Sequence, residues 1–273
     1  MRSRKRFAQH FLEPPWVVRL VEAIAPRTAD VFLEIGPGTG ALTRPLAARA
    51  ARVVAVEIDR DLAARLRASL PANVEVVEGD VLEADLPRLV ADAARQACCG
   101  AGARIRVVGN LPYNVSSPII FRLLAANEAR STWHDATLMV QAEVADRMVA
   151  SPGSKDYGVL AIMVGVAATA TRLFTLPPGA FRPMPRVRSA VVRLEAKPSP
   201  EGLDIRALAD FVRFLFQQRR KTLLSRLAAG WPGGKEEAVK AMAKVGIDPA
   251  RRPETLDLVE LRRLLEISPS PRG

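Results

Sequence analysis

Short apolar runs alternate with amphipathic stretches along most of the chain. The apolar runs are rich in Val, Ile and Leu and are bounded by Gly, Pro or charged residues, which is typical of strands buried on both faces of a sheet. They predict strands over Val31–Ile35, Arg52–Val56, Val74–Val77, Ile105–Gly109, Ala136–Val140, Thr171–Leu176 and Ser189–Leu194. The last two are expected to form a hairpin, with Ser189–Leu194 at the sheet edge.

The stretches between these strands have helical periodicity. They predict helices over residues 14–25, Ala41–Ala51, Asp61–Leu70, Asp85–Ala97, Val115–Ala126 and Gln141–Ala150, and over Val159–Ala168, where a strand is the less favoured alternative. Regular alternation of strands and helices indicates an α/β fold with a mostly parallel sheet, because parallel neighbours need a crossover connection.

The pattern changes near residue 198. Residues 197–202 are rich in Pro, Ser and Gly, a composition typical of a linker. Beyond it the periodicity is helical throughout, and it predicts helices over Leu203–Gln218, Lys221–Ala229, Glu236–Val245 and Leu256–Glu266. We therefore predict an α/β domain over residues 1–197 and a small all-α domain over 203–273.

Composition narrows the choice of partner. The 273 residues carry a net charge of +11, and this excess indicates a polyanionic partner, nucleic acid before membrane. A generic basic protein is the alternative. The two cysteines, Cys98 and Cys99, are adjacent, and only two histidines are present, so we predict no metal site and a reducing, cytoplasmic environment. We see neither a secretory signal nor a membrane-spanning run.

A glycine-rich turn follows the first predicted strand. Gly36-Pro37-Gly38-Thr39-Gly40 lies between that strand and a helix, the order found at nucleotide-binding turns of doubly wound sheets. It lacks the Lys-Ser/Thr pair of a phosphate-binding P-loop. Glu34, just before the turn, is expected to face the cationic end of a ligand or to brace the loop.

Acidic residues end the next two predicted strands. Glu57 lies about 20 residues after the first glycine, the offset of a carboxylate that accepts hydrogen bonds from a ribose with both hydroxyls free. Asp80 ends the third strand and can accept from an adenine amine. Solvated strand-end acids are the alternative for each residue alone, but their combination with the glycine turn favours a nucleoside-binding crevice.

The fourth predicted strand delivers Asn110-Leu111-Pro112-Tyr113 to the same edge of the sheet. Pro112 fixes its own φ and restricts Leu111 to extended conformations, so their carbonyls are held at the rim. The Asn110 amide oxygen and a rim carbonyl can accept from an exocyclic amine, while Tyr113 offers a flat surface for a heterocycle. A strand followed by a structural proline turn is the alternative.

Two further stretches combine features that suit a nucleic acid. Phe181, Arg182 and Arg186 lie in an irregular proline-bracketed loop, and an aromatic ring with flanking arginines can stack a base and hold its phosphates. Phe181 could instead fill the sheet edge.

Arg219, Arg220 and Lys221 form the densest basic patch of the helical region and are expected to contact phosphate. A solvated helix face is the alternative for this patch.

Taken together, these motifs resemble the ribosomal RNA adenine dimethyltransferase family, specifically the bacterial small-subunit (kasugamycin-sensitivity) type. The resemblance extends over nearly the whole chain. Its motifs are Gln9-His10-Phe11-Leu12, Glu34 to Gly38, Val56 to Asp59, Gly79-Asp80, Asn110 to Asn114, Phe181 to Pro185, Ser189 to Leu194, Gln218 to Thr222 and Gly246 to Pro249 with Arg252 and Glu254.

The resemblance implies a Rossmann-like class I S-adenosylmethionine methyltransferase fold. It implies cofactor binding by His10, Leu12, Gly36, Gly38, Glu57, Asp80 and Asn110. Position 10 is often Asn in relatives, so its side chain is the less certain contact. Catalysis is implied at Asn110, Leu111, Pro112, Tyr113 and Phe181, the last two stacking an extruded base.

The implied reaction yields N6,N6-dimethyladenosine at two adjacent adenosines in a hairpin near the 3′ end of 16S rRNA. The implied partner is an immature 30S subunit, which the enzyme modifies as a monomer during ribosome biogenesis. Four alternatives stay open: a large-subunit methyltransferase of the macrolide-resistance type, a mitochondrial relative, a ribosome-assembly chaperone without catalysis, and a nicotinamide dehydrogenase. The basic helix and the Gly-Ile-Asp-Pro ending favour the small-subunit type.

Overall fold

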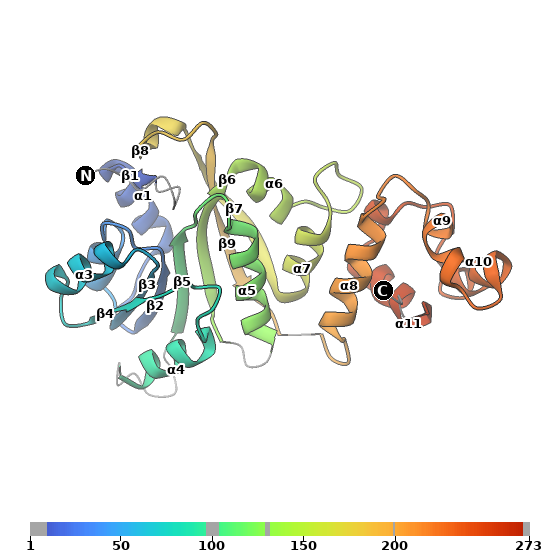
Figure 1. Cartoon of the computed structure of the whole chain (residues 1–273), viewed down its shortest axis with the longest axis horizontal. Coiled ribbons are helices and arrows are strands. Elements are labelled where there is room, and N and C mark those ends of the chain that lie inside the picture. Colours follow the sequence, from blue (N-terminus) through green and yellow to red (C-terminus); the bar gives the residue numbers. More distant parts are fainter. Residues whose placement is uncertain (1–9, 97–103, 129–131, 199, 270–273) are drawn as a thin grey trace. The chain divides into compact units, whose positions relative to one another are not determined.

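A computed structural model describes residues 10–96, 104–128, 132–198 and 200–269. The basic N-terminal arm with Gln9, the Cys98-Cys99 pair and the glycines of residues 100–102 lie outside this described part. By its contacts the chain divides into two compact units, one of Met1–Ala145 with Ala167–Pro198 and the other of Asp146–Val166 with Ser199–Gly273 (Figure 1). No described helix combines the length and apolar character needed to cross a membrane.

The first unit is built on a mostly parallel sheet, as predicted. Within the described residues its seven strands run in the order β4-β3-β2-β5-β6-β9-β7 (Figure 1). Their bounds are β2 (Asp30–Ile35), β3 (Arg52–Glu57), β4 (Val74–Glu78), β5 (Arg104–Asn110), β6 (Asp135–Gln141), β7 (Ala168–Leu176) and β9 (Ser189–Ala196). Neighbours from β4 to β6 are parallel, whereas β9 pairs antiparallel with both β6 and β7.

One predicted position in the sheet is wrong. The hairpin of β7 and β9 exists, but β7 forms the sheet edge and β9 lies inside, between β6 and β7. The burial of β9 explains the arrangement, because residues 189–192 and Leu194 are all buried and need cover from a strand on each side.

The register of the parallel strands brings the predicted motifs to one edge. Ile35 of β2 pairs with Val56 of β3 and with Gly109 of β5, so the residues that follow these strands emerge side by side. Ligands of open α/β sheets bind beyond the carboxyl ends of the strands. The glycine turn, Glu57 and Asn110 are therefore neighbours for a topological reason.

Helices cover the sheet on both sides. The helices of this part of the chain are α1 (Pro14–Ile24), α2 (Thr43–Ala47), α3 (Arg60–Ser69), α4 (Leu86–Gln96), α5 (Ser116–Glu128) and α6 (Ala142–Met148). Buried residues of α1 and α2 share one core cluster with alternate residues of the sheet, including Phe32 and Val53. Helices α4 and α5 contact each other and lie in front of the sheet in Figure 1. Helix α2 is shorter than the predicted Ala41–Ala51, because hydrogen-bonded turns replace its ends.

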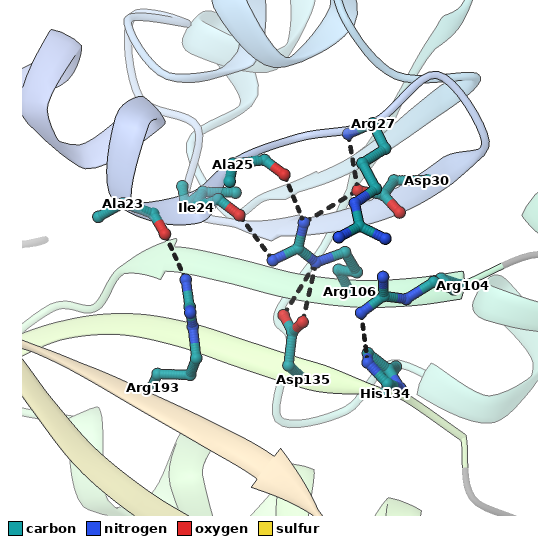
Figure 2. Close-up of polar contacts among 10 residues, drawn as sticks. All are labelled: Ala23, Ile24, Ala25, Arg27, Asp30, Arg104, Arg106, His134, Asp135 and Arg193. Atoms are coloured by element: carbon teal, nitrogen blue, oxygen red, sulfur yellow. Dashed lines mark hydrogen bonds and ion pairs between the residues drawn. The ribbon is translucent and has the colours of Figure 1, made fainter.

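A buried arginine joins the opposite end of the sheet to α1. Arg106, only 4% exposed, donates to both carboxylate oxygens of Asp135 at 3.0 and 2.9 Å and to Asp30 at 2.9 Å (Figure 2). It also donates to the carbonyls of Ile24 and Ala25, at 2.7 and 3.3 Å. The two carboxylates compensate the buried charge, and the guanidinium satisfies carbonyls that the end of a helix leaves open.

The second unit is helical and has its own core. Its helices are α7 (Val159–Ala167), which continues into the first unit at Ala167, and α8 (Ile205–Phe216), α9 (Leu223–Leu227), α10 (Gly234–Lys244) and α11 (Leu258–Ile267). Helix α7 confirms the helical interpretation of its ambiguous periodicity. Tyr157 and residues of α7 pack with those of α8 to α11, and the Tyr157 hydroxyl donates to the Leu256 carbonyl at 2.9 Å. By contacts, residues 146–166 thus group with the C-terminal helices. The two functional domains predicted from the sequence stay a prediction.

Candidate functional site

The glycine turn after β2 adopts a conformation that side chains disfavour. Gly36 and Gly38 have φ values of 68° and 60°, in the left-handed region where glycine is free of strain. A Cβ atom on Gly38 would lie 3.1 Å from the ring of Phe11 in β1 (Phe11–Leu12). The turn can therefore lie directly against the N-terminal segment only because glycine occupies this position.

Glu57 braces this turn from the end of β3. Its Oε2 accepts a hydrogen bond from the Gly38 N–H at 3.0 Å, and its Oε1 accepts from the Asp59 N–H at 2.9 Å. The side chain is nearly buried, and burial raises the pKa of Glu57 while the two backbone donors oppose that rise. Each oxygen keeps a second lone pair, so acceptance from ribose hydroxyls stays a prediction that the geometry permits.

A second carboxylate, Glu34, lies buried at the end of β2. It is 2% exposed, and its Oε2 has no hydrogen-bond partner among the described residues. Burial raises the pKa of Glu34 to about 7; the Thr43 hydroxyl opposes this rise and the nearby Glu57 carboxylate adds to it. A buried polar atom without a partner costs free energy, so an unsatisfied carboxylate in the wall of a pocket indicates a missing cationic or donor group.

Two adjoining hollows open at this edge of the sheet. The first is lined by most of the residues predicted to bind the cofactor, namely His10, Leu12, Gly36, Gly38, Glu57 and Asn110, and by Glu34. The second is lined by Asp80, Val81 and Leu82. Gly36, Ile58 and Pro112 line both hollows, so the two hollows adjoin at these residues.

Asp80 lines the second hollow, which it shares with Gly36 but with none of the other predicted cofactor residues. Its Oδ1 accepts from the Leu82 N–H at 2.9 Å, which fixes the carboxylate at the start of the loop after β4. No described donor bonds to Oδ2. An adenine amine would find an acceptor there if the ribose lay near Glu57.

Asn110 has one half of its amide already engaged. Its Nδ2 donates to the carbonyl of His10 at 2.8 Å, while no donor among the described residues bonds to its Oδ1. The N-terminal segment thus fixes which way the amide faces. Leu111, 1% exposed, is held from the other side because its N–H donates to the Met139 carbonyl at 3.0 Å.

Tyr113 is fixed at both ends of its side chain. Its ring stacks on the His10 imidazole, with centroids 5.3 Å apart and planes at 28°. Its hydroxyl shares a hydrogen bond of 2.5 Å with the Ser189 hydroxyl, and burial raises the pKa of Tyr113. Since His10 covers one face of the ring, a base can stack only on the other face.

Phe181 is buried, whereas the sequence predicted a ring that is open to an extruded base. It is 0% exposed and belongs to the core cluster beneath α1. Its strand β8 (Phe181–Arg182) pairs with β1, with Leu12 opposite Phe181. A base could reach this ring only if β1 and β8 separated, so the stacking role predicted for Phe181 has no support in this structure. Phe181 here fills the core instead.

The arginines predicted to bind RNA differ in their exposure and in the contacts that their side chains make. Arg182, mostly exposed, lies 3.4 Å from the Glu13 carboxylate, and Arg186 is exposed. Arg219 donates to Glu254 at 2.8 Å and to the Lys155 carbonyl at 2.9 Å.

Arg220 and Lys221, the other two residues of the basic patch, are exposed. Arg219 thus has a structural role within its own unit. Arg220 and Lys221 are the residues of this patch whose exposed charges can meet phosphate.

Sequence reasoning missed several residues of the site. Ser189 holds Tyr113, Met139 holds Leu111, and Phe11 and Ile58 line the first hollow. Ser189, Phe11 and Ile58 carried a signal, because each belongs to one of the motifs named above, whereas Met139 carried none. The roles of Met139 and Phe11 could not be predicted, because they depend on the register of β5 and β6 and on the β1–β8 pairing.

Comparison with known proteins decides the family. A family model described as ribosomal RNA adenine dimethylase matches residues 1–262. The chain belongs to this family. Ribosomal RNA small subunit methyltransferase A of Methylibium petroleiphilum is 46% identical over 86% of this chain and 86% of its own length. The protein of the same name from Bordetella petrii is 44% identical over 97% of this chain and 94% of its own.

Two solved structures show the same architecture. A dimethyladenosine transferase from Plasmodium falciparum has a TM-score of 0.76 at 26% identity and covers 94% of this chain and 97% of its own. The 23S rRNA methyltransferase ErmE has a TM-score of 0.66 at 27% identity, over 94% of this chain and 99% of its own. These findings confirm the resemblance and the class I methyltransferase fold predicted from the sequence.

Proposed function

We propose that this protein transfers methyl groups from S-adenosylmethionine to the N6 amines of two adjacent adenosines in the 3′-terminal hairpin of 16S rRNA, giving N6,N6-dimethyladenosine. The substrate is the immature 30S subunit, and the enzyme acts as a cytoplasmic monomer. The observation that supports the chemistry best is the half-engaged amide of Asn110. Its Nδ2 is bound by the His10 carbonyl at 2.8 Å, so its Oδ1 is left as an acceptor at the pocket rim.

The pocket fits the cofactor on observations of this structure. The unpartnered Oε2 of Glu34 suits the cationic methionine end, and the left-handed Gly36, which lines both hollows, presents no side chain to it. In this proposal Glu57 accepts hydrogen bonds from the ribose hydroxyls, and Asp80, in the adjoining hollow, accepts from the adenine amine; the position of each carboxylate in its hollow supports this assignment. When bound, S-adenosylmethionine supplies a sulfonium-activated methyl group.

The protein's own contribution is to position and polarise the target amine. The N6 lone pair of adenine is delocalised into the ring and is a weak nucleophile. Acceptance of N6–H bonds by Asn110 Oδ1 and by the carbonyl of Leu111 or Pro112 favours a pyramidal nitrogen, which localises the lone pair. Tyr113 stacks the base on the ring face that His10 does not cover.

No strong general base is required in this scheme. Once methylated, the nitrogen is cationic and its proton is acidic enough to pass to water. Positioning and electrostatics therefore supply the catalysis. The second transfer proceeds in the same way, because a monomethylated amine still has one N–H to donate to Asn110.

The test is methyl transfer from labelled S-adenosylmethionine to immature 30S particles, to 50S precursors and to free ribosomal RNA. We expect label on the 30S substrate, and its loss with Asn110→Ala. Asn73→Ala is a matched control, since Asn73 donates to the carbonyls of Ala47 and Ala50 away from the pocket. Label on 50S RNA would instead indicate the large-subunit activity. Tight 30S binding without label would indicate an assembly factor.

A further inference from the structure

A loop at the rim of the pocket exposes large apolar side chains to solvent. Met184 is 61% exposed, which makes it the most exposed large hydrophobic residue of the described chain, and Val187 is 42% exposed. Both lie between strands β8 and β9. Single exposed apolar residues are common, but two on one short loop beside a binding pocket call for an explanation.

The loop is hydrogen-bonded at both ends to residues that form the pocket. At its start, the Pro183 carbonyl accepts a hydrogen bond from Nδ1 of His10 at 2.7 Å. At its end, Ser189 shares a hydrogen bond of 2.5 Å with Tyr113. Pro185, in the middle, is buried. The apolar tip is therefore fixed relative to the two rings that border the site of the target base.

The charges around the tip identify its partner. Arg182, Arg186 and Arg188 alternate with the apolar residues along the loop, and all three are exposed. Arginines that hold phosphates beside an apolar side chain are the combination with which proteins enter a base stack. A protein interface would place such residues in a broader apolar surface, whereas here the apolar side chains stand between cations.

We propose that Met184, supported by Val187, is a wedge that enters the RNA base stack and fills the space left by the extruded adenosine. The energetic reason is that extrusion breaks base stacking, and an apolar side chain in the gap replaces part of the lost contact. The inference rests on the proposed function, because it presupposes an adenosine in the pocket. It assigns the RNA-facing role to the loop tip, in place of the buried Phe181.

The experiment compares Met184→Ala with Met184→Leu, which keeps the apolar bulk, and with Val18→Ala, which removes bulk at an equally solvent-exposed position of α1 (58% exposed). Each variant is assayed for kcat/KM on immature 30S particles and for the Kd of S-adenosylmethionine. A hairpin RNA with 2-aminopurine at the target position reports extrusion by its rise in fluorescence.

We expect Met184→Ala to lower kcat/KM about tenfold, which corresponds to about 1.4 kcal/mol, and to reduce the fluorescence rise. Met184→Leu and Val18→Ala should keep the wild-type kcat/KM and the wild-type fluorescence rise. The Kd of S-adenosylmethionine should stay unchanged in all three variants. Unaltered extrusion and kcat/KM in Met184→Ala, with an active wild type, would overturn the wedge alone. A wild type without methyl transfer would overturn the proposed function instead.

Discussion

The buried carboxylate of Glu34 gives a quantitative prediction for the protein without cofactor. Its pKa rises from 4.5 to about 7 because burial penalises the charged form by more than the Thr43 hydroxyl stabilises it. A raised pKa means that the folded state holds the proton more tightly than the unfolded state. The free energy of unfolding must therefore fall as the pH rises from 4.5 to 7, and it then levels off.

The magnitude follows from the shift. One pKa unit corresponds to about 1.4 kcal/mol, so a rise from 4.5 to about 7 amounts to a loss of about 3 kcal/mol of stability above pH 7. Glu34→Gln keeps the shape of the side chain and removes its charge. Relative to the wild type, this variant should be more stable by about 3 kcal/mol at pH 8 and nearly equal to it at pH 4.5.

The assay is urea unfolding of wild type and variant at both pH values, without cofactor. Glu22→Gln is the matched control, because Glu22 is an exposed carboxylate on α1. The difference in the free energy of unfolding between Glu22→Gln and the wild type should be the same at both pH values. If the advantage of Glu34→Gln were the same at pH 4.5 and pH 8, the proposed protonation of buried Glu34 would be refuted.

Three further predictions concern catalysis, stability and RNA binding. Asn110→Ala should lower kcat about a hundredfold or more, measured by single-turnover methyl transfer, while the Kd of S-adenosylmethionine changes little; a near-normal rate would refute the role of the amide oxygen. Arg106→Met should lower the free energy of unfolding by about 3–5 kcal/mol, measured in urea, since Asp30 and Asp135 stay buried without their cationic partner; an unchanged midpoint would contradict this. Arg220→Ala and Lys221→Ala should each flatten the salt dependence of RNA binding by about 0.7–0.9 in log–log slope, and an unchanged slope would make the pair a solvated face.

Much of the fold follows from local patterns. The strands could be predicted from apolar runs, because a parallel strand that is buried on both faces needs apolar residues at nearly every position. Strand β2, for example, is buried throughout. The place of β9 could not be predicted in this way, since the antiparallel pairing with both β6 and β7 depends on contacts between distant segments. The same limit explains the burial of Phe181, which depends on its pairing with Leu12.

The candidate site was predictable where a motif follows a strand. The glycine turn, Glu57 and Asn110 meet because parallel register aligns their strands, and they line one hollow. The links between these residues were not predictable. The bond from Asn110 to the His10 carbonyl joins residues far apart in the chain, and the brace from Glu57 to the Gly38 N–H needs the conformation of the turn.

The central claim is that this chain dimethylates two adjacent adenosines of 16S rRNA. The most direct measurement is mass spectrometry of nuclease fragments from immature 30S particles treated with the protein and S-adenosylmethionine. The account predicts two neighbouring N6,N6-dimethyladenosines in the 3′-terminal hairpin, and neither with Asn110→Ala. Modification at a single adenosine, at monomethyl level only, or elsewhere in the RNA would contradict it.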